Sequence, residues 1–322
     1  MPGPAISQSS RPDYWRKNRS RRETLRCHLQ PTPRNRNTRD IMSRIDLHTH
    51  TTWSDGSYAP AELIGWAHRH HIQTLAITDH DTTDGLNEAL ERSRTLGLDL
   101  IPGIAISARF QAREIHILGY FINHHDPVFQ TRIRALQATR LQRIRAILAK
   151  LELFDISLDL EDVQRLAGTG SIGRPHIAQL LITRGHVSTF KQAFEKYLGI
   201  RGNAYVPRDV PEASDACSWI REAGGVAILA HPFWEGYRQE EIDPACRILV
   251  ESGLQGLEVF YGTFSAKQIS FNLHLAKRFD LLVSGGSDFH GSFKPEIKIG
   301  KGKGDLNVPQ SALDKLRKAA GK

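Results

Sequence analysis

Residues 44–51 read RIDLHTHT, and this stretch decides the fold that the sequence predicts. The run RIDLH is typical of a short β-strand, and His48 and His50 lie at its end. Because side chains two residues apart on a strand point to the same side, both imidazoles face one site. A single histidine here would more often be a packing residue. A pair at this spacing, followed by Asp55, favours a ligand or catalytic role.

Short β-rich runs recur along the chain, and helical patterns separate several of them. The expected strands are 44–48, 74–78, 98–107, 114–121, 225–230, 256–260 and 281–286. The expected helices between them are 59–71, 84–96, 212–223, 243–252 and 265–278. Strands that alternate with helices predict parallel pairing and an α/β fold, and seven strands suit a barrel better than a small sheet.

Residues 125–205 interrupt this alternation. A long apolar pattern at helical spacing is followed by two shorter ones, which predicts a helical insertion that caps the substrate site. The arginines of the long helix are expected to form a solvated face. The predicted organisation is a basic disordered extension (1–41), a first barrel part (42–124), the insertion (125–205) and a second barrel part (206–322).

Histidine and aspartate residues also follow other predicted strands, as His48 and His50 follow the first. Asp79, His80 and Asp81 follow the second strand, His231 follows a later one, and Asp288 and His290 follow the last. His116 alternates with apolar neighbours on its own strand, so it faces the other side from them. The three histidines 68, 70 and 71 lie on a helix and are expected to be exposed. Because α/β barrels keep their active sites at the C-terminal ends of their strands, the first set is expected to converge.

Histidine together with carboxylate suits zinc, manganese or iron. The donors exceed one tetrahedral shell, which predicts at least two ions. A cluster of cations is well suited to phosphate ester hydrolysis, because it offsets the phosphate charge, ionises a bound water and stabilises the leaving oxygen.

The net charge of +8 is concentrated in residues 1–41, which hold ten basic and three acidic residues. This segment has little apolar content and is expected to be disordered. A nucleic-acid-binding arm and a true translation start at Met42 are the two alternatives. The three cysteines have no metal-ligand spacing, and no run of about 20 apolar residues occurs, which predicts a cytoplasmic protein with reduced thiols and no membrane span. No protein partner is predicted.

DLHTHTTWSDGSYAP, AITDHDTTDGL, HILGY, AHP and SDFHG together resemble the polymerase-and-histidinol-phosphatase (PHP) superfamily of metal-dependent phosphoesterases. The resemblance covers about residues 43 to 305. It implies a distorted seven-stranded barrel and a centre of up to three divalent ions, usually manganese, with zinc or iron as alternatives. The ligands that it implies are His48, His50, Asp55, His80, His116, His231, Asp288 and His290.

The sequence of the insertion resembles one subfamily within this superfamily. GRPHIAQLLITRGHVSTFKQAFEKYLG followed by AYVPR resembles the subfamily that hydrolyses 3′,5′-nucleoside bisphosphates and acts as a 5′-to-3′ exoribonuclease on short RNA. We therefore expect attack of a metal-bound hydroxide on phosphorus, with His48, His50, Asp55, His80, Asp288 and His290 at the reacting centre. Substrate contacts are expected from Asp81, Arg174, His176, Tyr205 and Arg208; the guanidinium groups suit phosphate because they bind it bidentately.

One residue departs from the family pattern. The strand normally reads Gly, a branched apolar residue, Glu, Ile, Ser, and here it reads Gly103 to Ser107 with Ala105 in place of the glutamate. That carboxylate would bridge two dications about 3.5–4 Å apart and offset their repulsion. The site is therefore either active with a weakened metal pair or impaired. The alternatives are a PHP phosphatase for another small phosphomonoester and a metal-poor domain used for binding.

Overall fold

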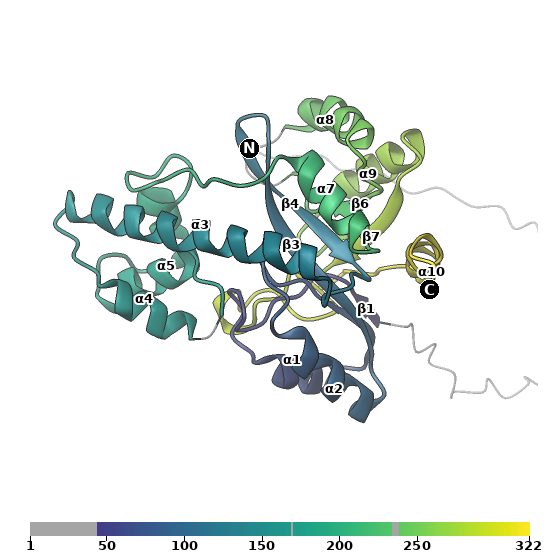
Figure 1. Cartoon of the computed structure of the whole chain (residues 1–322), viewed down its shortest axis with the longest axis horizontal. Coiled ribbons are helices and arrows are strands. Elements are labelled where there is room, and N and C mark those ends of the chain that lie inside the picture. Colours follow the sequence, from purple (N-terminus) through teal and green to yellow (C-terminus); the bar gives the residue numbers. More distant parts are fainter. Residues whose placement is uncertain (1–43, 169, 234–237) are drawn as a thin grey trace, which may run out of the picture. The chain divides into compact units, whose positions relative to one another are not determined.

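The computed structural model describes residues 44–168, 170–233 and 238–322 (Figure 1). The predicted basic extension and Cys27 lie outside the described residues. Cys217 and Cys246 are buried and free, as expected. None of the described helices is long and apolar enough to cross a bilayer.

Seven strands form one sheet in chain order, β1 to β7. Their bounds are β1 Arg44–Asp46, β2 Ile72–Ile77, β3 Asp99–Phe110, β4 Arg113–Tyr120, β5 Val226–Leu229, β6 Gly256–Tyr261 and β7 Leu282–Gly286. All seven lie close to their predicted positions. The expectation of parallel pairing is wrong for β4, which runs antiparallel to both β3 and β5. The reason is that β3 and β4 are joined by a tight turn, which allows only a hairpin and leaves no room for a crossover helix.

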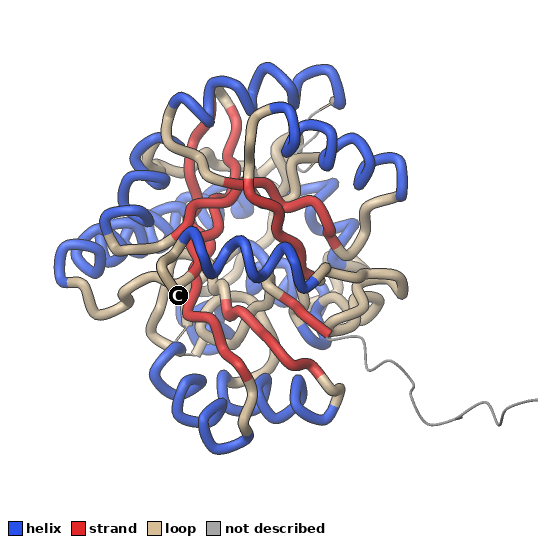
Figure 2. Tube along the Cα trace, turned by 90° about the vertical axis from the view of Figure 1, so that its right-hand side faces the viewer, coloured by secondary structure: helices blue, strands red, loops and turns tan. Residues whose placement is uncertain are grey.

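Backbone hydrogen bonds connect the last strand to the first. Leu47 N donates to Gly285 O at 3.1 Å, and Asp288 N donates to His48 O at 2.9 Å. One residue further on, His50 N donates to Phe289 O at 3.0 Å. The strands therefore enclose a common interior, and helices surround them (Figure 2). The segments after β1 and β7 lie side by side, which brings their polar residues together.

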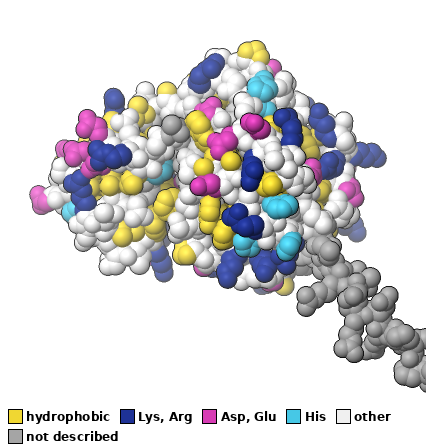
Figure 3. All heavy atoms as spheres, turned by 90° about the horizontal axis from the view of Figure 1, so that it is seen from below, with side chains coloured by type: hydrophobic (Ala, Val, Ile, Leu, Met, Phe, Trp, Pro, Cys, Tyr) yellow, Lys and Arg dark blue, Asp and Glu magenta, His cyan; other side chains and the backbone are white. Residues whose placement is uncertain are grey.

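Helices cover the outside of the sheet (Figure 1). They are α1 Pro60–Arg69, α2 Leu86–Leu96, α7 Ala213–Glu222, α8 Gln239–Glu251, α9 Ala266–Arg278 and α10 Gln310–Ala319. Local sequence explains the start of α9, where Ser265 accepts a hydrogen bond from Gln268 N, as an N-cap should. The face seen from below in Figure 1 mixes charged and hydrophobic side chains and shows surface histidines (Figure 3). His68 and His71 are exposed, as predicted.

The residues between β4 and β5 form mainly helices: α3 Pro127–Glu152, α4 Leu160–Ala167, α5 Arg174–Thr183, α6 Phe190–Ala193 and the π-helix η1 Phe194–Leu198. The helix α3 begins at Asp126, whose carboxylate accepts a hydrogen bond from Phe129 N at 2.7 Å. Its first half packs into the core beside α7 through residues such as Ile133. Its second half packs into a separate apolar cluster with α5 and η1, through residues such as Ile147 and Leu181. This long helix therefore joins the helical segment to the sheet.

Candidate metal centre

The predicted ligands come together at one end of the sheet. His48 and His50 follow β1, His80 follows β2, His231 follows β5, and Asp288 and His290 follow β7. His116 reaches the same place from antiparallel β4, where it pairs with Ser107 of β3. Apart from Asp55 and His80, which are slightly exposed, and His116, which is half-buried, these residues are buried.

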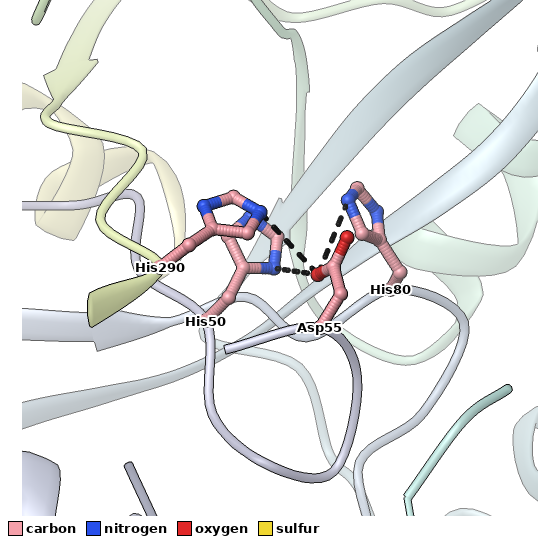
Figure 4. Close-up of side chains that lie close together, drawn as sticks. All are labelled: His50, Asp55, His80 and His290. Carbon is pink, nitrogen blue, oxygen red and sulfur yellow. Dashed lines mark ion pairs between the residues drawn. The ribbon is translucent and has the colours of Figure 1, made fainter. Parts of the chain in front are cut away.

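Asp55 lies at the centre of the first group of donors. Its Oδ1 is 3.3 Å from His290 Nε2, 3.7 Å from His50 Nδ1 and 3.9 Å from His80 Nε2. Figure 4 shows these three imidazoles directed at one carboxylate, although they come from three parts of the chain. One ligand atom from each of these four residues lies within 4.8 Å of those of the other three. This is the arrangement that a metal ion needs.

Asp288 is the carboxylate of the second group. Its Oδ1 lies 3.2 Å from His50 Nε2 and 3.4 Å from His48 Nε2. These three residues also form a compact set of donors. The other oxygen, Oδ2, accepts hydrogen bonds from Tyr261 Oη at 2.8 Å and Lys294 Nζ at 2.7 Å. One oxygen of Asp288 therefore faces the histidines while the other is held by its neighbours.

Several donor atoms in the centre are buried without a hydrogen-bond partner. They are Nε2 of His48, Nε2 of His50, Oδ1 of Asp55, Nδ1 of His80 and Nδ1 of His116. Buried polar atoms are nearly always hydrogen-bonded, so a cluster of exceptions calls for a missing partner. Because lone pairs of imidazole and carboxylate are what a transition metal binds, the residues present fit divalent ions.

The charges of the centre agree with this interpretation. Burial would raise the pKa of Asp55, but His290 and His80 hold it well below its usual range. Burial lowers the pKa of His116 to about 4 and that of His50 to about 3. His50 and His116 therefore keep their lone pairs at neutral pH, and Asp55 stays ionised. Both states are required for metal ligation.

Backbone strain also marks the centre. Asp81, His231 and Asp288 have positive φ angles of 54°, 25° and 59°. Such conformations are unfavourable for residues other than glycine and cluster at functional sites. At each of the three positions the strained residue is one that the sequence had singled out.

Glu258 is a residue of the centre that the sequence did not reveal. It lies on β6 and is fully buried. Its Oε1 is 2.9 Å from His48 Nδ1, and its Oε2 accepts a hydrogen bond from His231 N at 2.7 Å. Since a carboxylate only accepts, Nδ1 of His48 carries a proton and Nε2 is directed at the donors around Asp288. Such a carboxylate behind a histidine is the usual way to fix a metal ligand.

Asp81 occupies a different position from the metal donors. Its Oδ2 accepts hydrogen bonds from Arg208 Nη1 and Arg140 Nε, both at 2.7 Å, and its Oδ1 accepts one from Ser107 N at 2.7 Å. Burial opposes ionisation, but Arg208 and Arg140 keep the pKa of Asp81 far below its usual range. Asp81 thus holds two arginines beside the metal centre.

The metal centre opens into a cavity of about 450 Å³ between the sheet and the helical segment. Its cationic lining consists of Arg140, Arg143, Arg174, Lys191, Arg208 and Lys294. Its apolar lining consists of Ile144, Ile172, Pro175, Phe190, Phe194 and Phe293. The prediction that the arginines of the long helix form a solvated face is wrong for Arg140 and Arg143. These two are drawn inward by the carboxylates of Asp81, which is buried, and of Glu114, which is half-buried.

The predicted substrate residues are placed differently from one another. Arg174 and Arg208 both line the cavity. His176 and Tyr205 do not: the His176 ring accepts a hydrogen bond from Gly173 N at 3.0 Å, and the Tyr205 ring lies 5.5 Å from the Arg143 guanidinium. The first contact fixes the start of α5, and the second supports a cavity arginine from behind. Their substrate role stays a prediction.

Comparison with known proteins identifies the family to which this fold belongs. The profile of the PHP domain matches residues 46–206, which contain five of the eight expected ligands. The chain belongs to the PHP domain family. The PHP domain match begins in β1 and includes the whole helical segment up to η1, so the helices between β4 and β5 are covered by it.

Relatives within the PHP family cover most of the chain. The 5′-3′ exoribonuclease Rnm of Escherichia coli is 36% identical over 258 residues, which cover 80% of this chain and 88% of the relative. The 3′,5′-nucleoside bisphosphate phosphatase of Chromobacterium violaceum is 34% identical over 251 residues, which cover 77% and 88%. A crystal structure from Bifidobacterium adolescentis, assigned as a metal-dependent phosphoesterase, superimposes with a TM-score of 0.78 at 30% identity and covers 86% of this chain and 96% of that one.

Ala105, the residue expected to depart from the PHP pattern, lies beside His80. It forms an isolated parallel bridge with His80, and it pairs with Leu118, two residues from His116. Its side chain is fully buried among apolar residues of the barrel interior that include Leu47 and Ala230. The methyl group therefore continues the apolar interior up to the metal centre.

Proposed function

We propose that this protein is a metal-dependent phosphoesterase that releases phosphate from 3′,5′-nucleoside bisphosphates or nucleotides from the 5′ ends of short RNA. The observation that carries the proposal is the position of the two donor groups. Those built around Asp55 and Asp288 lie at the end of a cavity whose other walls are cationic and aromatic. A phosphate ester of a nucleoside needs all three surfaces: the metal donors, the cationic wall and the aromatic wall.

The residues proposed to hold divalent ions are the two compact donor groups. One is His50, Asp55, His80 and His290, and the other is His48, His50 and Asp288. Manganese is our first choice, and zinc and iron bind the same donors. Divalent ions at such a centre offset phosphate charge and make a bound water more acidic. Glu258 keeps His48 in one tautomer, and Tyr261 keeps Asp288 in one orientation.

The cavity wall opposite the metal centre supports a nucleotide substrate. Arg174 lies at the start of α5, where its Nη1 donates to Leu198 O at 3.2 Å and its guanidinium lies 5.6 Å from the Phe194 ring. It can therefore offer its other donors to a second phosphate. Phe190 and Phe293 lie 6.0 Å apart, one on the helical segment and one after β7, and both line the cavity. Their rings suit stacking against a nucleobase.

The test compares substrates under controlled metal content. Purified protein is stripped with a chelator, reloaded with manganese and assayed for phosphate release from 3′,5′-bisphosphoadenosine, 5′-adenosine monophosphate and an aryl phosphate. We expect release only after reloading, and the highest kcat/KM for the bisphosphate. His80→Ala should abolish the activity, whereas exposed His274→Ala should keep it. Metal-independent release, or equal kcat/KM for the bisphosphate and the aryl phosphate, would contradict the proposal.

A second candidate, an impaired PHP domain, is favoured by one observation, the alanine at position 105. That candidate predicts no phosphate release from any of the three substrates at any manganese concentration. The cytoplasmic location remains part of the proposal and is supported by the two buried free thiols.

A further inference from the structure

Asp79 is a buried carboxylate that lies outside both donor groups found in the described part of the chain. Its Oδ1 accepts hydrogen bonds from Thr51 N at 2.7 Å and from Ser54 Oγ at 2.6 Å, and its Oδ2 accepts one from Thr51 Oγ1 at 2.6 Å. The backbone of Asp79 is held as well, because Ala105 N donates to Asp79 O at 3.1 Å. Asp79 therefore ties the turn that leads to Asp55 to the strands β2 and β3.

Ser54 connects this carboxylate to His50. The amide of Thr51 already donates to Asp79 Oδ1, so this oxygen is an acceptor and the single proton of the Ser54 hydroxyl is directed at it. Their separation of 2.6 Å is typical of a hydroxyl that donates to a carboxylate. The Ser54 oxygen also lies 3.4 Å from His50 Nδ1, where it acts as an acceptor. The direction of the first hydrogen bond thus fixes the direction of the second.

His50 Nδ1 also faces the carboxylate of Asp55, whose Oδ1 lies 3.7 Å away. A lone pair on Nδ1 would be repelled by the oxygens of Ser54 and Asp55, whereas an N–H group can donate to either of them. The proton of the neutral ring is therefore favoured on Nδ1, which leaves the lone pair on Nε2. Nε2 lies 3.2 Å from Asp288 Oδ1 and so points into the donor group built around Asp288.

The other tautomer of His50 has one favourable contact. A proton on Nε2 could donate to Asp288 Oδ1, but the lone pair on Nδ1 would then face two oxygens that offer it no proton. That tautomer would also use the Asp288 oxygen for a hydrogen bond and remove an acceptor atom from the donor group. The tautomer with the proton on Nδ1 keeps both atoms available to a cation.

His48 shows the same arrangement beside His50. Its Nδ1 donates to Glu258 Oε1 at 2.9 Å, and its Nε2 lies 3.4 Å from Asp288 Oδ1. With both rings in this tautomer, two nitrogen lone pairs and one carboxylate oxygen converge with no proton between them. Such a set of donors suits a divalent ion.

We propose that Ser54 and Asp79 are positioning residues of the metal centre, which keep the proton of His50 on Nδ1 and its lone pair on Nε2. They act through His50 and not on the substrate. Glu258 does the same for His48 by direct contact, whereas here a hydroxyl stands between the imidazole and the carboxylate. Partners of this kind orient metal ligands and increase their basicity. The inference rests on the metal-dependent function proposed above and adds two residues to it.

Manganese titration of the chelator-stripped protein tests Ser54. Ser54→Ala should weaken manganese binding roughly tenfold to a hundredfold, as expected when a residue that orients a metal ligand is lost. The control is Ser93→Ala on α2, which also removes a buried hydroxyl, one that donates to Leu90 O at 2.9 Å. Urea denaturation of both metal-free variants compares their losses of stability, and only Ser54→Ala should lose manganese affinity. An unchanged affinity in Ser54→Ala would overturn the proposal.

Two substitutions test Asp79. In Asp79→Asn the amide oxygen can still accept from Thr51 N and Ser54 Oγ, and the amide nitrogen can donate to Thr51 Oγ1, so most of the manganese affinity should be retained. In Asp79→Ala the Ser54 proton loses its acceptor and becomes available to His50 Nδ1, so the affinity should fall as in Ser54→Ala. An equally large fall in Asp79→Asn would overturn the proposed chain of hydrogen bonds.

The tautomer of His50 can be measured in the wild type and does not depend on whether a variant folds. Protein with isotope-labelled histidines is loaded with zinc, which is diamagnetic and suits the same donors. The nitrogen chemical shifts then show which ring nitrogen carries the proton, and comparison with His50→Gln identifies the signals. We expect the proton on Nδ1 and zinc on Nε2. A proton on Nε2 in the wild type would overturn the proposal.

Failure of this inference is distinguishable from failure of the proposed function. Zinc on Nε2 of His50 in a protein that releases no phosphate from any substrate would remove the activity and keep the inference. Metal-dependent phosphate release together with unchanged manganese affinity in Ser54→Ala would keep the activity and remove the inference.

Discussion

Arg208 and Asp81 form a buried ion pair across 127 positions of sequence. Arg208 Nη1 lies 2.7 Å from Asp81 Oδ2, and the two side chains are 1% and 0% exposed. Arg208 also donates through Nη2 to Leu136 O at 2.6 Å and through Nε to Thr139 Oγ1 at 2.9 Å. Most of its donors are therefore used within the protein. The pair connects the segment after β2 to α3 and the segment before α7, so it holds the helical segment against the metal centre.

Arg208→Ala is predicted to act mainly on stability. Breaking a buried ion pair costs about 3–5 kcal/mol, because the partner charge is left buried. We expect the lower end of this range, since Arg140 remains beside Asp81. Chemical denaturation gives the free energy of unfolding. The control is Arg132→Ala on α3, whose pair with Glu222 is more exposed and should contribute much less to stability. Equal losses in the two variants would contradict this structural role.

Arg174→Ala is predicted to act mainly on substrate binding. Arg174 lines the cavity and makes one hydrogen bond to a backbone carbonyl, so its removal leaves no buried charge unpaired. The KM for 3′,5′-bisphosphoadenosine should rise roughly tenfold to a hundredfold, as expected for one charge-assisted contact. The KM for an aryl phosphate should change little, because that substrate has no second phosphate. A similar rise for both substrates would remove Arg174 from a specificity role.

The arrangement of the metal donors could be predicted because it depends on local rules. His48 and His50 share a side since a strand has a period of two, and donors that follow parallel strands meet at one end of the sheet. The same rule placed His116 opposite its apolar neighbours, and the structure has it lining the cavity. The pattern of polar residues in apolar strands was therefore sufficient to find the side chains that converge, whereas the ligand role of His116 followed from the family resemblance and stays a prediction.

The features that the sequence did not predict depend on contacts between residues that are far apart in the chain. Glu258 sits in the apolar run GLEVF, where a lone glutamate could equally have faced solvent, and its partner His48 is 210 positions away. Arg140 and Arg143 repeat on a long helix in the way that solvent-facing arginines do. Only the fold shows that Asp81 and Glu114 lie opposite them. The reversal of β4 was likewise set by the short β3–β4 turn and not by the strand pattern.

Glu258→Gln is predicted to weaken metal binding while the fold is kept. The amide has the same shape as the carboxylate, but it holds the Nδ1 proton of His48 less strongly and no longer increases the basicity of Nε2. Loss of such a carboxylate typically costs tenfold to a hundredfold in metal affinity. Manganese titration of the stripped protein measures the effect, and exposed Glu251→Gln is the control. An unchanged manganese affinity in Glu258→Gln would show that His48 needs no such partner.

The stability of the metal-free protein is predicted to fall as the pH falls below about 6.5. Burial depresses the pKa of His116 to about 4 and that of His50 to about 3, and it depresses those of His80 and His231 as well. In the unfolded chain these histidines take up protons near pH 6.5, so between that pH and the folded pKa the unfolded state binds more protons and is favoured. His48 opposes the trend, because Glu258 and Asp288 raise its pKa despite its burial.

The free energy of unfolding falls by roughly 1.4 kcal/mol for each unit by which a pKa is depressed. Several histidines together therefore give a loss of stability on the order of a few kcal/mol between pH 7 and pH 5. Denaturation with urea at a series of pH values, in the presence of a chelator, measures it. His116→Gln cannot take up a proton in either state, so its curve should be flatter by the share of one histidine. A wild-type curve that is level from pH 7 to pH 5 would show that these imidazoles are protonated as easily in the folded protein as in the unfolded chain, and that they are not poised as neutral metal ligands.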